Sequence, residues 1–197
     1  MMNTSLKLIS LSLFAAACSK SSAEGGAKAE PAVAIDAAAV NALVPADLKA
    51  KLVFEQRDVI EERGRHNITY TFAAPKGWNQ GMKGFASLKG GDDVGFMTSF
   101  DVGSNCDGSC EPKDWAKVAD KVNFTQFAEA TVVKNEVTPT SRLLIADRDD
   151  STYVMYAWWT AGARNYHTCR ASLEKPVRAA APAFAKACQA VAVKGDD

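Results

Sequence analysis

The alternation of apolar and polar side chains predicts a series of β-strands from residue 51 onward. In NITYTFAAP, Ile68, Tyr70 and Phe72 fall on one face of an extended chain, with threonines between them. Further strands are expected in KLVFEQRDVIEE, MKGFASLKG, VGFMTSFDVG, EATVVKNEV, SRLLIAD, TYVMYAWWT and RNYHTCRAS. Short turn sequences such as GGDD and RDDS separate several of them, so we expect an antiparallel meander.

One of these strands, TYVMYAWWT, is apolar on both faces. Tyr156 and Trp158 fall on one side of an extended chain, and Met155 and Trp159 fall on the other. A strand with two apolar faces is typically central in its sheet and covered on both sides. The sequence therefore predicts a covering layer on each face.

Two segments have helical periodicity. In EPKDWAKVADKV, Pro112 suits a first helical turn, and the apolar residues Trp115, Val118, Ala119 and Val122 share one face. In PVRAAAPAFAKACQAVAV, the apolar stripe consists of Val177, Ala181, Phe184, Cys188 and Val191. Pro182 should break or restart this last helix. The predicted fold class is α+β, an antiparallel β-sheet meander flanked by helices.

The stretch TYTFAAPKGWN, in which an aromatic strand runs into a Pro-x-Gly-Trp turn, resembles the opening of PsbP-like domains. The strand meander and the closing helix APAFAKACQAV are similar to the same family over about residues 50–192. The resemblance implies an α/β/α sandwich and a non-enzymatic accessory domain that binds or stabilises a larger assembly. It implies no catalytic residue, and disulfides are not part of the usual family pattern.

The chain begins with features of a secretory signal peptide, expected over residues 1–17. Lys7 precedes the apolar run LISLSLFAAA, which is shorter than the ~20 residues that a membrane-spanning helix needs. The alanines before Cys18 resemble a bacterial lipobox, although Ala15 stands where the commonest pattern has leucine. The resemblance implies transfer of diacylglycerol to the Cys18 thiol, cleavage before Cys18, acylation of the new amine with a chain such as palmitate, and membrane anchoring. Simple secretion is the alternative.

The residues after Cys18 set the expected location and domain organisation. Ser19 gives no acidic retention signal, which by resemblance to lipoproteins places the protein on the outer membrane of a Gram-negative bacterium, on its periplasmic or cell-surface face. The Ala-, Ser- and Gly-rich tract that follows predicts a flexible tether, so residues 18–45 form the lipidated N-terminus and tether, and residues 46–197 form a single globular domain. Lys and Arg number 23, as do Asp and Glu, which argues against electrostatic binding of nucleic acid.

The number of cysteines is consistent with an exported protein. Without Cys18, the four that remain allow three disulfide pairings, of which we expect Cys106–Cys110 and Cys169–Cys188. Two alternatives are a redox-active dithiol and a zinc site made of Cys106, Cys110, His167 and Cys169. A redox-active dithiol usually has two residues between its cysteines, whereas three separate Cys106 and Cys110. An oxidising compartment favours disulfides over zinc.

The sequence contains no familiar catalytic motif, such as GxSxG, HExxH or a phosphate-binding glycine loop. The aromatic residues Trp158, Trp159 and Tyr166, with His167, are candidates for a binding groove, because Tyr and Trp combine apolar bodies with polar groups. We expect a non-enzymatic binding or assembly module of the cell envelope with an envelope protein partner, no cofactor and no metal. The alternative is an envelope hydrolase, or another enzyme with an unrecognised active site, in which His167 would be the base.

Overall fold

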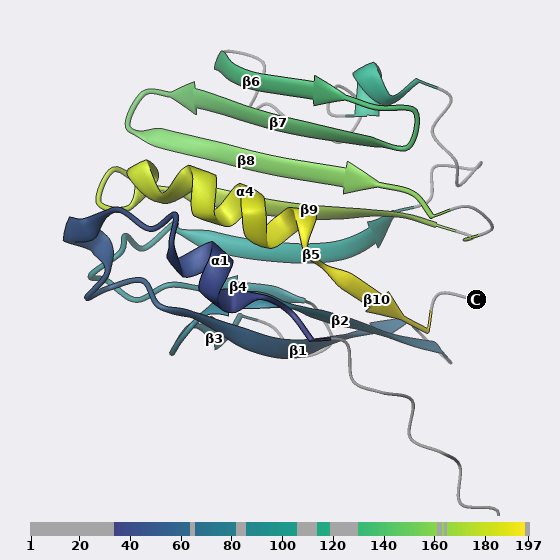
Figure 1. The fold of residues 1–197 in the computed structure, drawn as a ribbon, viewed down its shortest axis with the longest axis horizontal. Coiled ribbons are helices and arrows are strands. Elements are labelled where there is room, and N and C mark those ends of the chain that lie inside the picture. Colours follow the sequence, from purple (N-terminus) through teal and green to yellow (C-terminus); the bar gives the residue numbers. More distant parts are fainter. Residues whose placement is uncertain are drawn as a thin grey trace, which may run out of the picture. The chain divides into compact units, whose positions relative to one another are not determined.

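The computed structural model describes residues 34–63, 66–81, 86–105, 114–118, 130–160, 163 and 165–195. All of them belong to one compact unit, Val33–Asp197. The elements, labelled in Figure 1, are α1 (Ala37–Asn41), η1 (Ala46–Leu48), β1 (Phe54–Arg63), β2 (His66–Pro75), β3 (Asn79–Gln80), β4 (Ser87–Lys89), β5 (Ser99–Asn105), η2 (Trp115–Lys117), β6 (Thr131–Val137), β7 (Ser141–Arg148), β8 (Ser151–Trp158), β9 (Tyr166–Leu173), η3 (Arg178–Ala180), α4 (Ala181–Gln189) and β10 (Ala192–Lys194).

The strands of the described residues form two antiparallel sheets. The larger sheet has seven strands in the order β3-β4-β5-β9-β8-β7-β6, and the smaller has three in the order β1-β2-β10. Strands β6 to β9 pair with their neighbours in sequence, as a meander does. The predicted antiparallel sheet and the mixed α+β class are therefore confirmed.

The central strand β8 separates two apolar clusters. Tyr156 and Trp158 pack against the larger cluster, which also contains α4, whereas Met155 and Trp159 belong to a smaller cluster on the opposite face. In the smaller cluster, Trp115 of η2 covers the sheet. The prediction that β8 is central and covered on both faces is confirmed.

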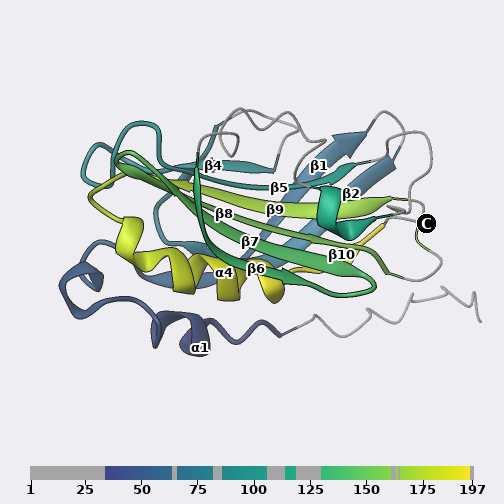
Figure 2. The same ribbon diagram turned by 90° about the horizontal axis from the view of Figure 1, so that it is seen from above.

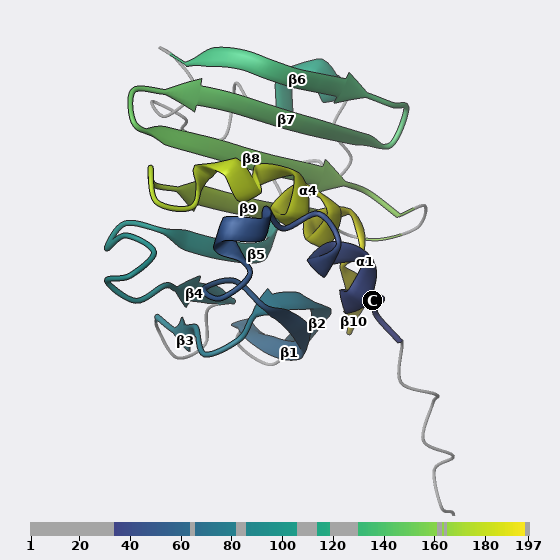
Figure 3. The same ribbon diagram turned by 60° about the vertical axis from the view of Figure 1, so that its left-hand side comes forward.

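The larger cluster joins α4 to both sheets. The ring of Phe184 in α4 lies 5.1 Å from Phe54 of β1 and 5.2 Å from Phe100 of β5. Phe100 in turn lies 5.3 Å from Phe72 of β2, so the small sheet packs on the same face of the large sheet as α4. Figure 2 shows α1 and α4 on one side of the seven strands, and Figure 3 shows β1 and β2 beside its β4–β5 end.

The C-terminal segment differs from its prediction in one respect. Pro182 occupies the first turn of α4, after the 3₁₀ turn η3, so the expected restart at this proline is confirmed. The helix ends at Gln189, however, and Val191 is outside it. The next residues form β10, which pairs with β2 through Val193 and Tyr70.

Three further segments differ from, or extend beyond, their predictions. Val94–Met97 form turns instead of the start of a strand, because the Thr98 hydroxyl donates to the Val94 carbonyl and closes the turn. Residues 34–45, expected in the tether, are part of the fold, since Val40 of α1 is fully buried and α1 contacts α4 and β1. Within EPKDWAKVADKV, only residues 114–118 are described, and they form the 3₁₀ turn η2.

Candidate functional site

Within the described residues, the outer edge of β5 is paired with a neighbouring strand over only part of its length. The short strand β4 pairs with Ser99–Asp101, and the Val102 N–H still donates to the Ala86 carbonyl at 2.8 Å. Beyond this point, the Ser104 N–H donates to Oε2 of Glu61 at 3.2 Å. The Ser104 hydroxyl donates to the same oxygen, also at 3.2 Å. A carboxylate from the small sheet therefore accepts the backbone donor at this end of β5.

Glu61 reaches this position because β1 turns one row of side chains inward. Arg57, Val59 and Glu61 alternate on the face that also carries the buried Ile68 and Tyr70 of β2. A charged residue in an inward-facing row is the sequence signal that could have identified Glu61. Its partner Ser104 is 43 residues away in sequence, so no local pattern connects the two.

Glu61 also anchors a buried chain of hydrogen bonds between the sheets. The Tyr70 hydroxyl donates to Oε2 of Glu61 at 3.0 Å, and its oxygen lies 3.3 Å from Nδ1 of His167 in β9. Tyr70 and His167 are 0% and 2% exposed. A tyrosine hydroxyl carries a single proton. Because that proton is directed to Glu61, we assign a proton to Nδ1 of His167, which then donates to Tyr70.

A pocket of about 270 Å³ opens beside this carboxylate. Its polar lining residues are Glu61, Ser87, Asp101, Ser104, Asn105, Thr168 and Arg170. Gly103 leaves space in this lining, since a Cβ built on it would lie 3.8 Å from Oε1 of Glu61, at ordinary contact distance.

The rigid strands fix the charges of the pocket. Asp101 and Arg170 face each other across the β5–β9 pair, so opposite charges stand side by side. Asp101 also accepts a hydrogen bond from the Ser99 hydroxyl, and the Asn105 amide donates to the Thr168 hydroxyl. The pocket can therefore offer carboxylate acceptors and a guanidinium donor to one small ligand.

The structure divides the four aromatic-groove candidates between two faces of the sheet. Trp158 and His167 lie on the α4 face with their rings 5.3 Å apart. Trp159 and Tyr166 belong to the smaller cluster on the other face, where Tyr166 packs edge-on against Trp115. His167 is thus placed near Trp158 and Tyr70 but not near Trp159.

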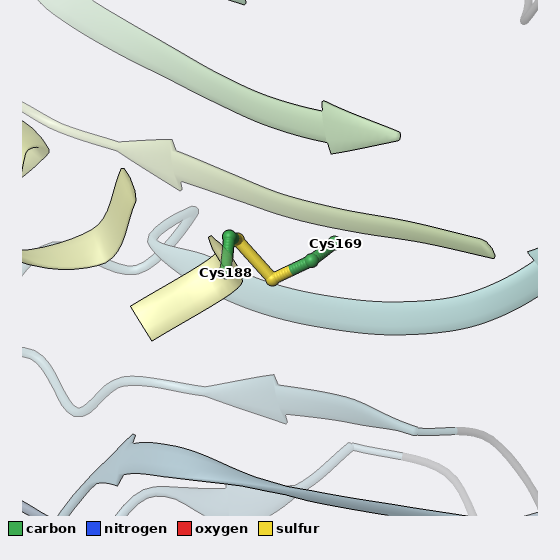
Figure 4. Close-up of a disulfide and its surroundings, with 2 residues drawn as sticks. All are labelled: Cys169 and Cys188. Atoms are coloured by element: carbon green, nitrogen blue, oxygen red, sulfur yellow. A yellow bond between two sulfur atoms is a disulfide. The ribbon is translucent and has the colours of Figure 1, made fainter. Parts of the chain in front are cut away.

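The expected Cys169–Cys188 disulfide is present and joins β9 to α4 (Figure 4). Both residues are fully buried. The alternative zinc set loses Cys169, because its sulfur is bonded to Cys188. Cys18, Cys106 and Cys110 lie outside the described residues, so the Cys106–Cys110 pairing and the lipidation of Cys18 stay predictions.

Two features are absent from the described residues. No group of three or more His, Cys, Asp or Glu side chains is arranged to hold a metal ion. Across the same residues, no helix has the length and apolar character needed to cross a bilayer.

Comparisons with protein-family models, with curated proteins and with solved structures find no match to this chain.

Proposed function

We propose that this chain is a lipid-anchored cell-envelope protein whose folded domain is a non-enzymatic binding module. The pocket beside Glu61 carries this proposal. It combines charges of both signs with a shape fixed by two sheets, which is typical of sites that orient a small ligand.

The ligand that suits this pocket is small and carries a positive and a negative group, as a free amino acid does. Sites for drug-sized ligands enclose ~300–1,000 Å³, and this pocket of about 270 Å³ is smaller. An ammonium group would be bound by the carboxylates of Glu61 and Asp101. A carboxylate would be bound by Arg170, whose planar guanidinium can donate two parallel hydrogen bonds.

The architecture supports a binding role and does not require catalysis. The large sheet has α4 on one face and the Trp115 segment on the other, which is consistent with the α/β/α sandwich of PsbP-like domains. We propose that resemblance as the finer description of the fold. We assign His167 a structural role, because its ring packs against Trp158 and it is hydrogen-bonded to Tyr70.

The binding proposal is tested by isothermal titration calorimetry, in which glycine is added to the purified full-length protein in detergent. Acetate and methylammonium are the matched probes, since each carries one of glycine's two charges. We expect glycine to bind at least about tenfold more tightly than either. Equal affinities for the three would contradict the proposed ligand class, and no binding of any would contradict a ligand site.

A pocket-filling variant gives the structural control. Gly103→Val places a β-branched side chain, which suits a strand, in the pocket without a steric clash at Cβ. Glycine binding should fall at least about tenfold, and Gly103→Ala should lie between the two. Unchanged binding in a folded Gly103→Val protein would place the ligand elsewhere.

The anchor and the location rest on the sequence around Cys18. In a Gram-negative host fed an alkyne analogue of palmitate, the full chain should be labelled and should fractionate with the outer membrane. Cys18→Ala should be unlabelled and lost from the membrane. Labelling of the variant would remove the anchor from the proposal without affecting the pocket. In-cell crosslinking of the anchored protein would then identify the expected envelope protein partner.

A further inference from the structure

Strand β6 forms one edge of the seven-stranded sheet, and all seven of its residues are exposed (Figure 1). Val132, Val133 and Val137 are 57%, 61% and 46% exposed. Exposed edge strands with apolar side chains are ready templates for pairing with another strand.

The hydrogen-bond pattern shows which backbone groups of β6 point outward. The Trp159 N–H donates to the Thr140 carbonyl, and the Thr138 N–H donates to the Ser141 carbonyl. Because these directions alternate along an antiparallel strand, Leu143 and Ile145 of β7 direct their backbone groups toward β6. Their partners in β6 are Glu136 and Lys134, whose backbone N–H and C=O groups therefore point toward β7.

It follows that Asn135 and Val137, which alternate with these residues, direct their N–H and C=O groups away from β7. Val133 is the extra residue where the register shifts between Val132 and Lys134, so it ends the regular part of the strand.

We propose that the outer edge of β6 pairs with the β6 edge of a second copy of this chain. The pairing is antiparallel about a two-fold axis at Asn135, so that Asn135 faces Asn135 of the other copy. Its backbone groups then form two reciprocal hydrogen bonds. Counting outward from the axis places Lys134 opposite Glu136 and Val133 opposite Val137, each twice by symmetry.

The charges select this register over its neighbours. Within one chain, Lys134 and Glu136 form an exposed ion pair at 3.0 Å. With the axis at Asn135, each also meets its opposite charge across the interface, at the closely spaced pairs where side chains interact most. An axis shifted to Lys134 would place two lysines face to face, and one shifted to Glu136 would oppose two glutamates. Like charges in these positions disfavour both alternatives.

This inference is independent of the pocket and of the lipid anchor. Its test is a self-disulfide. Asn135→Cys, made in the full chain, places two thiols opposite each other at the axis, where Cα atoms of a hydrogen-bonded pair are ~5.5 Å apart. This separation lies within the ~4.4–6.8 Å range of disulfides. Glu136→Cys, on the same strand, faces Lys134 of the other copy instead and is the matched control.

After mild oxidation and non-reducing electrophoresis, the disulfide-linked dimer of Asn135→Cys should exceed that of Glu136→Cys by about tenfold. The unsubstituted protein shows the background from native cysteines. Equal yields, or a disulfide to a different protein, would overturn the proposal.

A charge swap adds a second readout. Lys134→Glu should lower dimer formation by Asn135→Cys about tenfold, and adding Glu136→Lys should restore it. Since Lys134 and Glu136 are both exposed in one chain, thermal unfolding should be unchanged in these variants when it is measured at a dilution where the protein is monomeric. A charge reversal that leaves the dimer yield unchanged would exclude the register at Asn135.

Discussion

Among the described residues, the outer edge of β5 is covered only in part and the outer edge of β6 is open, and the backbone donors of the two edges are treated differently. At β5, where β4 stops, Glu61 accepts the Ser104 N–H from another sheet. At β6, within the part of the chain that the structure describes, no strand pairs with the outer edge. Figure 3 shows β6 at one end of the sheet and the three-stranded sheet near the other.

The difference shows what each edge can become. Backbone donors bound by a carboxylate within the chain leave rigid polar walls, and a pocket forms beside them. Backbone donors left at an exposed edge are available to another strand. The Lys134–Glu136 pair and the bulge at Val133 limit that availability, as charges and bulges do on natural edge strands. The same charges specify which strand is accepted.

The disulfide that joins β9 to α4 should contribute the most to stability among the features tested. Replacing both Cys169 and Cys188 by alanine removes the disulfide without leaving a free thiol. Bridging residues 19 apart constrains the unfolded chain, so the free energy of unfolding should fall by about 3 kcal/mol. Urea denaturation without reductant, followed by tryptophan fluorescence, measures it. The control, Lys134→Ala with Glu136→Ala, removes an exposed ion pair and should change stability by about 0.5 kcal/mol or less. A loss below about 1 kcal/mol for the cysteine variant would contradict this expectation.

The next prediction concerns Glu61, whose carboxylate accepts hydrogen bonds from Ser104 and Tyr70. Glu61→Ala leaves the donors of Ser104 and Tyr70 without this acceptor, which should lower the free energy of unfolding by about 2 kcal/mol. Glu61→Gln keeps an oxygen acceptor and should lose about half as much. Glu62→Ala, on the exposed face of the same strand, is the control and should have little effect. If Glu61→Ala and Glu62→Ala were equally stable in urea denaturation, Glu61 would not stabilise the β5 edge.

Sequence patterns predicted most of the strands but not every element of the fold. Segments rich in β-branched and aromatic residues, separated by short turns, predicted β1, β2 and the β6–β9 meander, and β6 was predicted although it has no buried face. The same reasoning missed β10, since Val191 and Val193 continue the apolar composition of α4, and only the pairing with β2 makes the latter a strand residue. It also assigned α1 to the tether. The alanine-rich composition there is ambiguous, and burial of Val40 against the rest of the fold decides it.

The candidate site was less predictable than the fold. The four aromatic-groove candidates were predicted as one group, but the structure puts Trp159 and Tyr166 in the cluster on the other face from Trp158. The Cys169–Cys188 bond was expected from parity and compartment. The pocket was not predicted, because it requires β1 to lie beside the end of β5. That placement depends on how the two sheets pack, through contacts such as Phe72 with Phe100, which no local pattern encodes.

The exposure of β6 is tested by a substitution that should have little effect on stability. Val137→Thr changes an exposed side chain and should alter the free energy of unfolding by about 0.5 kcal/mol or less. The same change at Val59, which is buried in β1, introduces a hydroxyl into the core and should cost about 1–2 kcal/mol. Denaturation at two protein concentrations adds the decisive contrast. If Val137 is covered by a second copy, any loss at Val137→Thr should shrink on dilution, since dimer stability depends on concentration. A loss above about 1 kcal/mol that is independent of concentration would mean that Val137 is covered within its own chain, and β6 would then not be an open edge.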